Sequence, residues 1–499
     1  MSRPAAIRIA DGDNVAVALR VIAAGETVSV AGEQVTARQE IPAGHKIALA
    51  GLEPEQTVTK YGVPIGIATA AIERGDWVHS HNLRTSLSGV LDYQYSPNGV
   101  HAAARPTNVP TFKGYKRANG KIGTRNELWV LNTVGCVNHS AERIAKQAAE
   151  RYAGRVDGIH AFAHPYGCSQ LGDDLKNTQA VLAGLLRHPN AGGVLILGLG
   201  CENNQLDELM RLAGDVDTSR IAFFNTQDVI DELEEGTGAV ARLVERVSED
   251  RRVESPVSDL VLGHKCGGSD GFSGMTANPL LGRIADRLTS LGGSVLLTEV
   301  PKMFGAERQL MSRATSEAVF SDVVNMVNDF KQYFLRHNQP VYENPSPGNK
   351  AGGLTTLEEK SLGAIQKGGR APVSHVLRYG QQVNGPGLSL LESPGNDGVS
   401  STAMVVSGAT ILLFTTGRGT PLGFPVPTIK VSSNTDIATR KPHWIDFNAG
   451  ELLDGTKTMA QLEDDLFALI LAAASGERLA NNEKNGYREI AIWKEGVTL

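Results

Sequence analysis

The sequence has few cysteines, few aromatic residues and no long apolar run, and each shortage excludes a class of protein. Four cysteines in 499 residues cannot form the disulfide framework of a secreted protein, so we expect free thiols or metal ligands. No segment approaches the roughly 20 apolar residues of a membrane span, and the first residues lack a signal peptide's apolar run. Charge is nearly balanced, with 48 Lys and Arg against 54 Asp and Glu. We therefore expect a cytoplasmic protein that binds neither nucleic acid nor a membrane.

The chain divides into segments of different pattern. Residues 1–90 have short β-type runs broken by glycine about every ten residues, which is typical of a small all-β domain. Residues 91–122 are rich in Ser, Asn, Pro and Gly without a hydrophobic period, and we interpret them as an irregular linker. In residues 123–252 and 253–499 apolar strands alternate with amphipathic helices, one of them a long helix over 305–337. This alternation predicts a two-part α/β region with parallel sheets.

All four cysteines follow an apolar strand-like run, where parallel sheets place their ligands. They are Cys136, Cys168, Cys201 and Cys266. Thiols from different strands could meet at an iron–sulfur cluster, but the sequence has no short C-x-x-C element, so we favour small buried thiols packed beside glycine turns.

The same strand-end loops carry amides, carboxylates and hydroxyls, among them Asn203 and Ser269. Such side chains suit a small polyhydroxylated ligand, and we expect Asn203 and Ser269 to bind substrate. Gly198-Leu-Gly200-Cys-Glu-Asn203 begins like a dinucleotide fingerprint, but Asn203 replaces the third glycine, which makes a nicotinamide site weakly supported.

Trp77-Val-His79-Ser-His81 places two histidines two residues apart. On a strand they would share one face, so the pair predicts a metal site suited to Fe, Mn or Zn, although two exposed strand histidines are the alternative. His45, in Gly44-His45-Lys46, lies in another turn of the same segment.

Two arginine turns are candidate anion clamps. Arg418 stands between glycines after the strand ILLFTT, and Arg125 and Asn126 follow Gly123-Thr124. A guanidinium between flexible backbone positions fits a carboxylate, so we expect Arg125, Asn126 and Arg418 to bind substrate; ordinary surface ion pairs are the alternative.

Long motifs along the chain resemble the altronate/galactarate dehydratase family. They include KYGVPIG (60–66), VHSHN (78–82), GTRNELWVL (123–131), YGCSQLGDD (166–174), GLGCENNQ (198–205), CGGSDGFSGMTANP (266–279), TEVPKMFGAE (298–307), NPSPGNKAGG (344–353) and the TTGRGTP loop. Lys265 stands where we expect Glu or Gln in relatives.

The resemblance implies an N-terminal β-clip of the SAF type joined to the two-part α/β region. It also implies a cytoplasmic hydro-lyase that converts a sugar acid, with D-altronate favoured over galactarate, to a 2-keto-3-deoxy acid. A divalent metal is implied, Fe(II) first and Mn(II) second, and we expect a homo-oligomer. The reaction removes the C2 hydrogen and expels the C3 hydroxyl, so it needs a base and an acid; His45, His164 and Asp270 are the candidates.

Two other interpretations remain at this point. An iron–sulfur dehydratase would use the cysteines in place of the histidines, and a sugar-acid binding protein without enzymatic activity would fit a two-lobed α/β fold.

Overall fold

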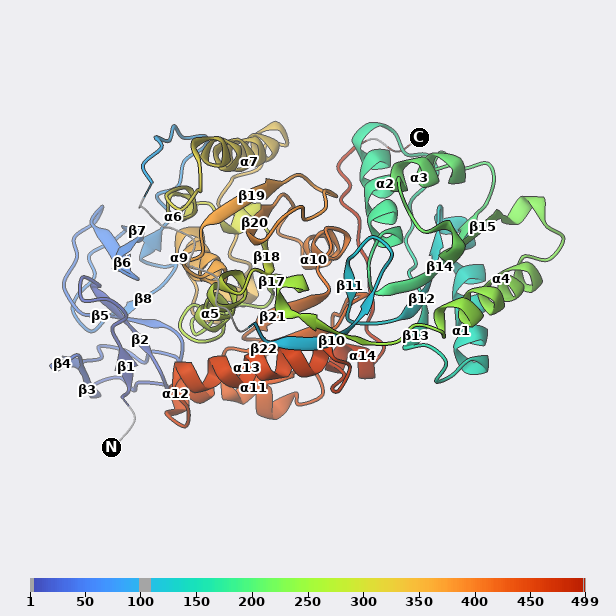
Figure 1. The fold of residues 1–499 in the computed structure, drawn as a ribbon. Helices are drawn as coiled ribbons and strands as arrows, with labels where there is room; N and C mark the ends of the chain where they lie inside the picture. Colours follow the sequence, from blue (N-terminus) through green and yellow to red (C-terminus); the bar gives the residue numbers. More distant parts are fainter. Residues whose placement is uncertain (1–3, 98–108, 497, 499) are drawn as a thin grey trace.

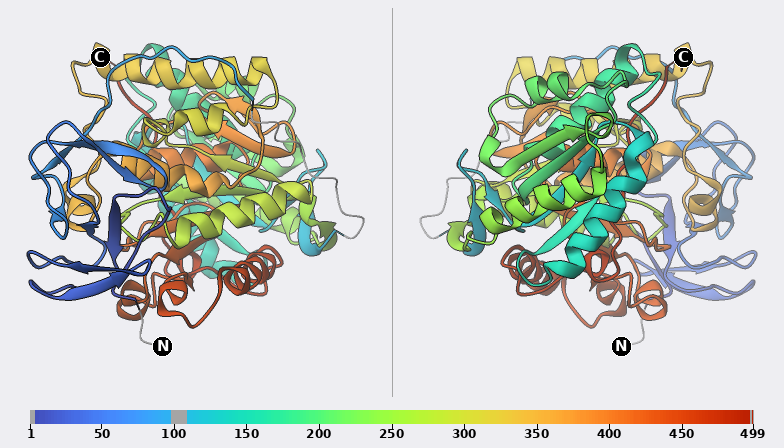
Figure 2. Two further views of the ribbon diagram at one scale, coloured as in Figure 1. Left: turned by 90° about the vertical axis from the view of Figure 1, so that its left-hand side faces the viewer. Right: turned by 90° about the vertical axis from the view of Figure 1, so that its right-hand side faces the viewer.

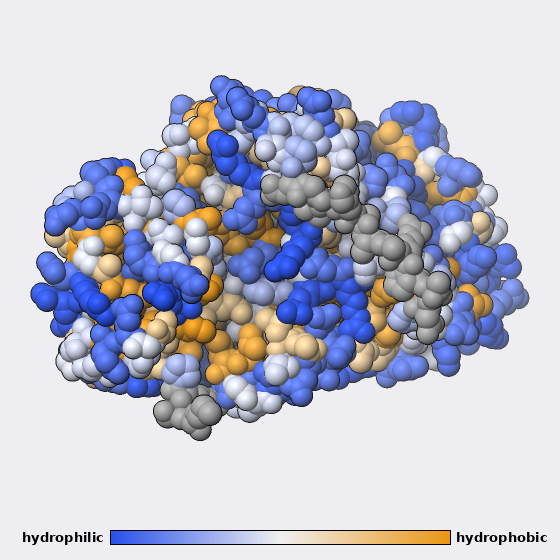
Figure 3. Space-filling model, turned by 60° about the vertical axis from the view of Figure 1, so that its left-hand side comes forward, coloured by the Kyte–Doolittle hydropathy of each residue, from blue (hydrophilic) through white to orange (hydrophobic). Residues whose placement is uncertain are grey.

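The computed structural model describes residues 4–97, 109–496 and 498. Three parts follow one another along the chain, and the N-terminal and middle parts lie at opposite ends of the molecule with the C-terminal part between them (Figures 1 and 2). Among the described residues, no helix is long and apolar enough to cross a membrane. On the face drawn in Figure 3, hydrophilic side chains predominate and apolar residues form small separate patches.

The N-terminal part is all-β, as the glycine spacing predicts. A four-stranded antiparallel sheet has the order β1-β2-β5-β8, beside the hairpin β3-β4 and the sheet β6-β7-β9. Alternating or continuous buried Val, Ile and Ala residues form its core. The strands are β1 (Ala6–Ile7), β2 (Val15–Ala18), β3 (Thr27–Val30), β4 (Glu33–Thr36), β5 (Lys46–Ala48), β6 (Thr57–Lys60), β7 (Val63–Ala68), β8 (Trp77–Val78) and β9 (Leu83–Arg84).

The middle part is a parallel sheet with helices on both faces. Its order is β13-β12-β14-β15. One apolar core joins this sheet to α1 and α4, and another joins its opposite face to α2 and α3. The elements are β12 (Glu127–Asn132), α1 (Asn138–Arg151), β13 (Gly158–Ala161), α2 (Gly172–Leu186), β14 (Ala191–Gly198), α3 (Leu206–Ala213), β15 (Ile221–Asn225) and α4 (Glu232–Val247).

The C-terminal part has a seven-stranded parallel sheet of order β19-β20-β18-β17-β21-β22-β23. Its strands are β17 (Val261–Cys266), β18 (Ser294–Leu297), β19 (Val373–Leu377), β20 (Gly387–Leu391), β21 (Ile411–Thr416), β22 (Thr428–Ser432) and β23 (Phe447–Asn448). Its helices are α5 (Ala277–Ser290), α6 (Glu307–Met311), α7 (Glu317–Arg336), α8 (Pro347–Ala351), α9 (Leu357–Ala364), α10 (Asp397–Val406), α11 (Thr435–Arg440), α12 (Glu451–Asp454), α13 (Met459–Ala474) and α14 (Asn481–Lys484). Both predicted parallel sheets are therefore present.

Two sequence expectations need correction. The segment 91–122 is not wholly irregular, because β10 (Thr111–Lys116) pairs antiparallel with β16 (Val253–Pro256) and with β11 (Ile122–Gly123). Residues 98–108 of that segment lie outside the described residues. The helix expected over 305–337 is two helices, α6 and α7, and the side chain of Ser316 caps the second by accepting a hydrogen bond from Val319 N.

A buried ion cluster fastens the β-domain to the C-terminal part. Lys46 Nζ and Lys60 Nζ lie 2.9 Å and 2.7 Å from the carboxylate of Glu359, and all three side chains are at most 1% exposed. Lys46 and Lys60 come from β5 and β6, whereas Glu359 comes from α9. The two domains thus share one desolvated charge network, which fixes the cleft between them.

Candidate functional site

The C-terminal sheet changes winding direction between β17 and β21. The strands that follow β17 along the chain, β18 to β20, lie on one side of it, and β21 to β23 lie on the other. Ligand sites in open parallel sheets form beyond the carboxyl ends of strands at such a switch point. The loops leaving β17 and β21 carry Ser269, Asp270 and Arg418, which sequence reasoning selected.

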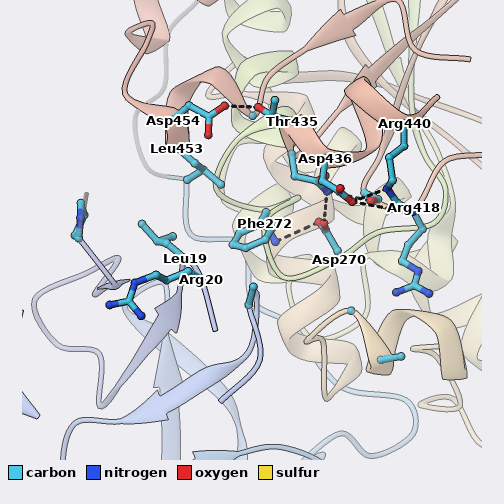
Figure 4. Close-up of a pocket in the computed structure, with 17 residues that line it drawn as sticks. Leu19, Arg20, Asp270, Phe272, Arg418, Thr435, Asp436, Arg440, Leu453 and Asp454 are labelled. Atoms are coloured by element: carbon cyan, nitrogen blue, oxygen red, sulfur yellow. Dashed lines mark hydrogen bonds and ion pairs between the residues drawn. The ribbon is translucent and has the colours of Figure 1, made fainter. Parts of the chain in front are cut away.

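A cleft of about 720 Å³ opens beside these loops, between the β-domain and the C-terminal part (Figure 4). The volume falls in the ordinary range for a small-ligand site. Pro4, Leu19, Arg20 and Ala43 line it from the β-domain, and Asp270, Phe272, Arg418, Asn434, Asp436, Arg440, Leu453 and Asp454 are among the residues that line it from the other side.

Asp270 is the buried carboxyl of this cleft. Its Oδ1 accepts hydrogen bonds from the amide and hydroxyl of Ser273, at 2.9 and 2.8 Å, and from Ser433 Oγ at 2.8 Å. Asn434 Nδ2 donates to Oδ2 at 2.9 Å. Burial raises the pKa of Asp270, and these donors oppose the rise. Asp270 therefore joins two strand-end loops and presents a carboxyl with a raised pKa to the cleft.

Arg418 is exposed in the cleft and, within the described part of the chain, has no carboxylate partner. Arg440, by contrast, is paired with Asp436 at 2.6 Å. The loop that leaves β17 lies against this turn, because Arg418 N donates to the carbonyl of Gly268 at 3.0 Å. A free guanidinium in a polar cleft is suited to a carboxylate ligand.

Lys360, which sequence reasoning missed, is a buried amine beside the same loop. Its Nζ donates to Asn344 Oδ1 at 2.6 Å and to Asn349 Oδ1 at 2.8 Å, and Asn349 Nδ2 donates to the carbonyl of Ser269 at 2.8 Å. Burial, followed by the nearby charge of Lys302, lowers the pKa of Lys360 to about 7. The motif NPSPGNKAGG contains both asparagines and was the sequence feature that could have pointed to this part of the site.

A buried charge cluster continues from the end of β17. Lys265 contacts Glu299 and lies 2.6 Å from Asp397, and Lys302 also contacts Glu299. Burial raises the pKa of Glu299, but the ammonium groups outweigh it and hold the pKa at about 2. Glu299 has a left-handed backbone with φ of 71°, a conformation that non-glycine residues rarely keep without a local reason. Lys265 is thus part of a compensated network.

The histidines of the β-domain do not form the predicted pair. β8 ends at Val78, so His79 and His81 lie in a turn, where His79 is buried and His81 is exposed. His79 stacks instead on His45, with ring centroids 5.0 Å apart. The same-face argument for a shared metal ion is therefore wrong, because it assumed that the strand continued.

The ring nitrogens of His45 and His79 already have partners. Trp77 Nε1 donates to His45 Nδ1 at 3.2 Å, and His45 Nε2 lies 3.3 Å from the carbonyl of Ala351. His79 Nε2 lies 2.9 Å from the carbonyl of Lys350 and its Nδ1 lies 3.0 Å from Ser80 Oγ. Burial lowers the pKa of His45 to about 4. Both rings are therefore neutral near pH 7, and they anchor the β-domain to the end of α8.

A divalent metal does not fit these residues as they are arranged. Within residues 4–97, 109–496 and 498, no three His, Cys, Asp or Glu side chains are grouped so that they could hold one ion. His79 and His81 would each have to change partners or position first. No step of the chemistry is therefore assigned to a metal at this pair.

Arg125 and Asn126 lie away from the cleft. They precede β12 and so occupy the amino edge of its sheet, whereas ligand sites form at the carboxyl edge. Arg125 is 2% exposed and its Nε and Nη2 donate to Glu483 at 2.6 and 2.9 Å. Asn126 is buried, with its Oδ1 accepting from Arg117 at 2.9 Å. The expected substrate clamp is instead a structural contact.

His164 and Asn203 lie in the strand-end loops of the middle part, where they hold backbone rather than line the cleft. His164 Nε2 lies 2.8 Å from the carbonyl of Asn132, and its Nδ1 accepts from Tyr166 N at 3.2 Å. Asn203 Oδ1 accepts from Ser169 N at 2.7 Å. Of the predicted residues, Asp270 and Arg418 line the inter-domain cleft, whereas His164 and Asn203 lie in the strand-end loops of the middle part.

Family profiles match all three parts of the chain. The altronate/galactarate dehydratase SAF domain matches residues 4–86, the second domain of D-galactarate dehydratase/altronate hydrolase matches 114–248, and the C-terminal domain of D-galactarate/altronate dehydratase matches 257–498. The SAF-type β-clip inferred from the sequence is confirmed.

Curated relatives align from end to end. Altronate dehydratases of Bacillus subtilis and Escherichia coli are each 50% identical, over 99% of this chain and 99% of theirs. The galactarate dehydratase (L-threo-forming) of E. coli is 33% identical over 98% of this chain and 96% of its own. Every domain and nearly every residue is covered, so the protein belongs to the D-galactarate/altronate dehydratase family.

Proposed function

We propose that this protein is a hydro-lyase that converts D-altronate to 2-keto-3-deoxy-D-gluconate and water. The observation that carries the proposal is its 50% identity, over the full length, to two altronate dehydratases, against 33% to a galactarate dehydratase. Altronate has one carboxylate, and the free guanidinium of Arg418 offers one clamp for it. Galactarate, with a carboxylate at each end, is the alternative substrate.

In this proposal the reaction is divided between Arg418 and Asp270, which line the cleft, and Lys360, which is buried beside Asn349 next to the same loop. The hydrogen at C2 is hardly acidic beside a carboxylate, so charge that develops on the carboxylate oxygens must be stabilised, and Arg418 is placed to do so. Lys360, an amine with a pKa of about 7, takes the C2 proton. Asp270, whose pKa is raised by burial, gives a proton to the hydroxide that leaves C3. Ser269 precedes Asp270, and its carbonyl accepts a hydrogen bond from Asn349, which holds the loop that carries Asp270.

The predicted requirement for Fe(II) or Mn(II) stays part of the proposal, without a ligand set in the cleft. The cytoplasm is the proposed location, since three exposed free thiols stay reduced there.

We also propose a homo-oligomer. The edge strand β15 exposes Phe223, and Ile230 beyond it is fully exposed, so both offer apolar area to a second copy. Light scattering after size-exclusion chromatography measures this.

The test is competitive turnover of D-altronate and galactarate by the purified protein, with the 2-keto acid product measured by coupled assay. The expected result is a higher kcat/KM for altronate. The matched control is the Lys360→Met chain, whose circular dichroism shows whether it folds. A higher kcat/KM for galactarate would contradict the substrate assignment, and no 2-keto acid from either would contradict the reaction.

A further inference from the structure

A second cavity, of about 470 Å³, lies at the amino edge of the middle sheet. Its walls are the turn between β10 and β11, the end of α2, the start of β14 and the segment between α3 and β15. Figure 1 shows β11 between α2 and the C-terminal part. Among the described residues, none lines both this cavity and the inter-domain cleft. The two cavities are therefore separate, and this one has no part in the proposed reaction.

Four Lys and Arg side chains line the cavity, and two of them have carboxylate partners. Arg117 Nη1 lies 2.9 Å from Asp250 Oδ2, and Arg220 Nη2 lies 2.7 Å from Asp250 Oδ1. Arg220 Nε also lies 3.4 Å from Asp217 Oδ2. The two carboxylates compensate these two guanidinium groups, which therefore form part of the wall.

The other two cations, Lys121 and Arg187, are half-buried and have no carboxylate partner in the part of the chain that the structure describes. Lys121 Nζ donates to the amide oxygen of Gln382 at 2.9 Å. Arg187 Nη1 donates to the carbonyl of Leu212 at 3.3 Å, and its Nε has no hydrogen-bond partner among the described residues. Both cations therefore have neutral partners only, and both lack a counter-charge.

Lys121 and Arg187 are close enough to act on each other. Burial, followed by the charge of Arg187, lowers the pKa of Lys121, and burial lowers the pKa of Arg187. Two further titratable residues of the lining do not relieve this repulsion. His188 is neutral at pH 7, because burial lowers its pKa to about 4, and the exposed Asp215 forms no ion pair with either cation within the described residues. An anion held between Lys121 and Arg187 would supply the missing charge.

We propose that this cavity binds phosphate between Lys121 and Arg187, either as the free ion or as the phosphate group of a small metabolite. A phosphate group carries a charge of about −1.5 to −2 at pH 7 and several acceptor oxygens, which matches two uncompensated cations, whereas a carboxylate supplies one charge. Guanidinium and ammonium groups are the common phosphate partners in proteins. The volume falls within the range for small-ligand sites and leaves room for an organic part.

The two cations come from different parts of the chain. Lys121 lies on the turn between β10 and β11 and contacts Gln382 of the C-terminal part, whereas Arg187 caps the end of α2 in the middle part. Bound phosphate would therefore link these two parts at their junction. The proposal concerns a second site and does not depend on which sugar acid is the substrate.

The test is isothermal titration calorimetry of the full chain at low ionic strength with inorganic phosphate, glucose 6-phosphate and glucose. Both phosphates should bind and glucose should not. Tighter binding of glucose 6-phosphate assigns the site to a phosphorylated metabolite, and equal or weaker binding assigns it to free phosphate. Lys121→Met and Arg187→Met should each weaken phosphate binding by about 10- to 100-fold, whereas Lys121→Arg, which keeps the charge, should restore most of the affinity.

Two control variants locate the binding. Arg246→Met removes a cation on α4 that pairs with Glu249 on the surface, and it should leave the affinity unchanged. Arg418→Met, in the inter-domain cleft, should also keep phosphate binding, and its loss there would place the ion in the cleft and overturn the proposal. Equal affinity in Arg187→Met and in the parent, or no phosphate binding by the parent, would overturn it as well.

Circular dichroism of every variant separates loss of binding from loss of the fold. Altronate turnover in phosphate-free buffer keeps this proposal apart from the proposed function, and Lys121→Met and Arg187→Met should both retain the parent kcat/KM. Turnover without phosphate binding would remove the second site and leave the proposed function, and phosphate binding without turnover would do the reverse.

Discussion

Replacing Glu359 by Gln should loosen the β-domain from the rest of the molecule. The substitution keeps the shape of the side chain but leaves the ammonium groups of Lys46 and Lys60 buried without a counter-charge. Burial raises the pKa of Glu359, but the two lysines outweigh it and the pKa lies well below the usual value. The carboxylate is therefore ionised in the folded protein at neutral pH.

The size of the effect follows from the desolvation of all three side chains. Breaking a buried pair by removing one partner costs about 3–5 kcal/mol, because an uncompensated charge stays inside. Because about 1.4 kcal/mol changes an equilibrium constant tenfold, the equilibrium for local opening of the β-domain should rise roughly a hundredfold to several thousandfold. The amide oxygen of the Glu359→Gln variant would still accept one hydrogen bond from Thr355 N, which donates to Glu359 at 2.9 Å in the parent, so the lower half of the range is expected.

The assay is amide hydrogen exchange over β5, β6 and β7, where local opening can be read without assuming that the whole chain unfolds in one step. Glu55→Gln is the matched control, since Glu55 pairs with Arg84 between two side chains that are more than half exposed, and such pairs contribute about 0–1 kcal/mol. Because the pKa of Glu359 is depressed on folding, its contribution is present above about pH 4.5 and is lost as the pH falls. Equal protection in the two variants would refute the reasoning.

Three further predictions concern the cleft and its surroundings. Lys360→Met should lower kcat by roughly 10²- to 10⁴-fold. It should also remove the limb of the pH profile of kcat that rises through about pH 7, where the amine of Lys360 loses its proton. Lys350→Met is the control, and an unchanged limb in Lys360→Met would show that another residue is the base. Arg418→Met should lower kcat/KM by about 10- to 100-fold, since a hydrogen bond to a charged group contributes about 1.5–3 kcal/mol, and an unchanged value for altronate would remove it from carboxylate binding. Arg125→Met should lower the thermal midpoint and leave KM unchanged, because its guanidinium is committed to Glu483, and a raised KM with normal stability would restore the substrate role.

The sequence predicted the architecture because both kinds of sheet leave a local pattern. Continuous apolar runs followed by amphipathic helices appear wherever a parallel strand is covered on both faces, as in β12 with α1. The pairing of β10 with β16 left no such pattern. Its strands are about 140 residues apart in the chain and contain lysine and glutamate, so only the folded chain brings them together.

The strand-end rule selected residues of both sheets, and it placed His164 and Asn203 in the loops of the middle part, outside the cleft. Asp270 and Arg418 follow strands and reach the cleft. Arg125 precedes β12, so the same rule would have placed it at the amino edge of the sheet, away from ligand sites. His79 and His81 were misjudged because the end of β8 at Val78 leaves no hydropathy signal. Lys360 was missed because the lowering of its pKa comes from burial and from the nearby charge of Lys302, which no local sequence spacing reveals.

The fourth cysteine shows why position at a strand end does not decide what a thiol does. Cys266 ends β17 as regularly as Cys136 follows β12, but it is fully buried and Lys367 Nζ donates to its sulfur at 3.1 Å. Burial raises the pKa of Cys266, and the lysines around it outweigh burial and lower it. This sulfur is therefore a member of the charge network with Glu299, enclosed in protein, whereas the three thiols of the middle sheet are exposed. Neighbouring side chains and exposure, which the sequence does not show, therefore decide the surroundings of each thiol.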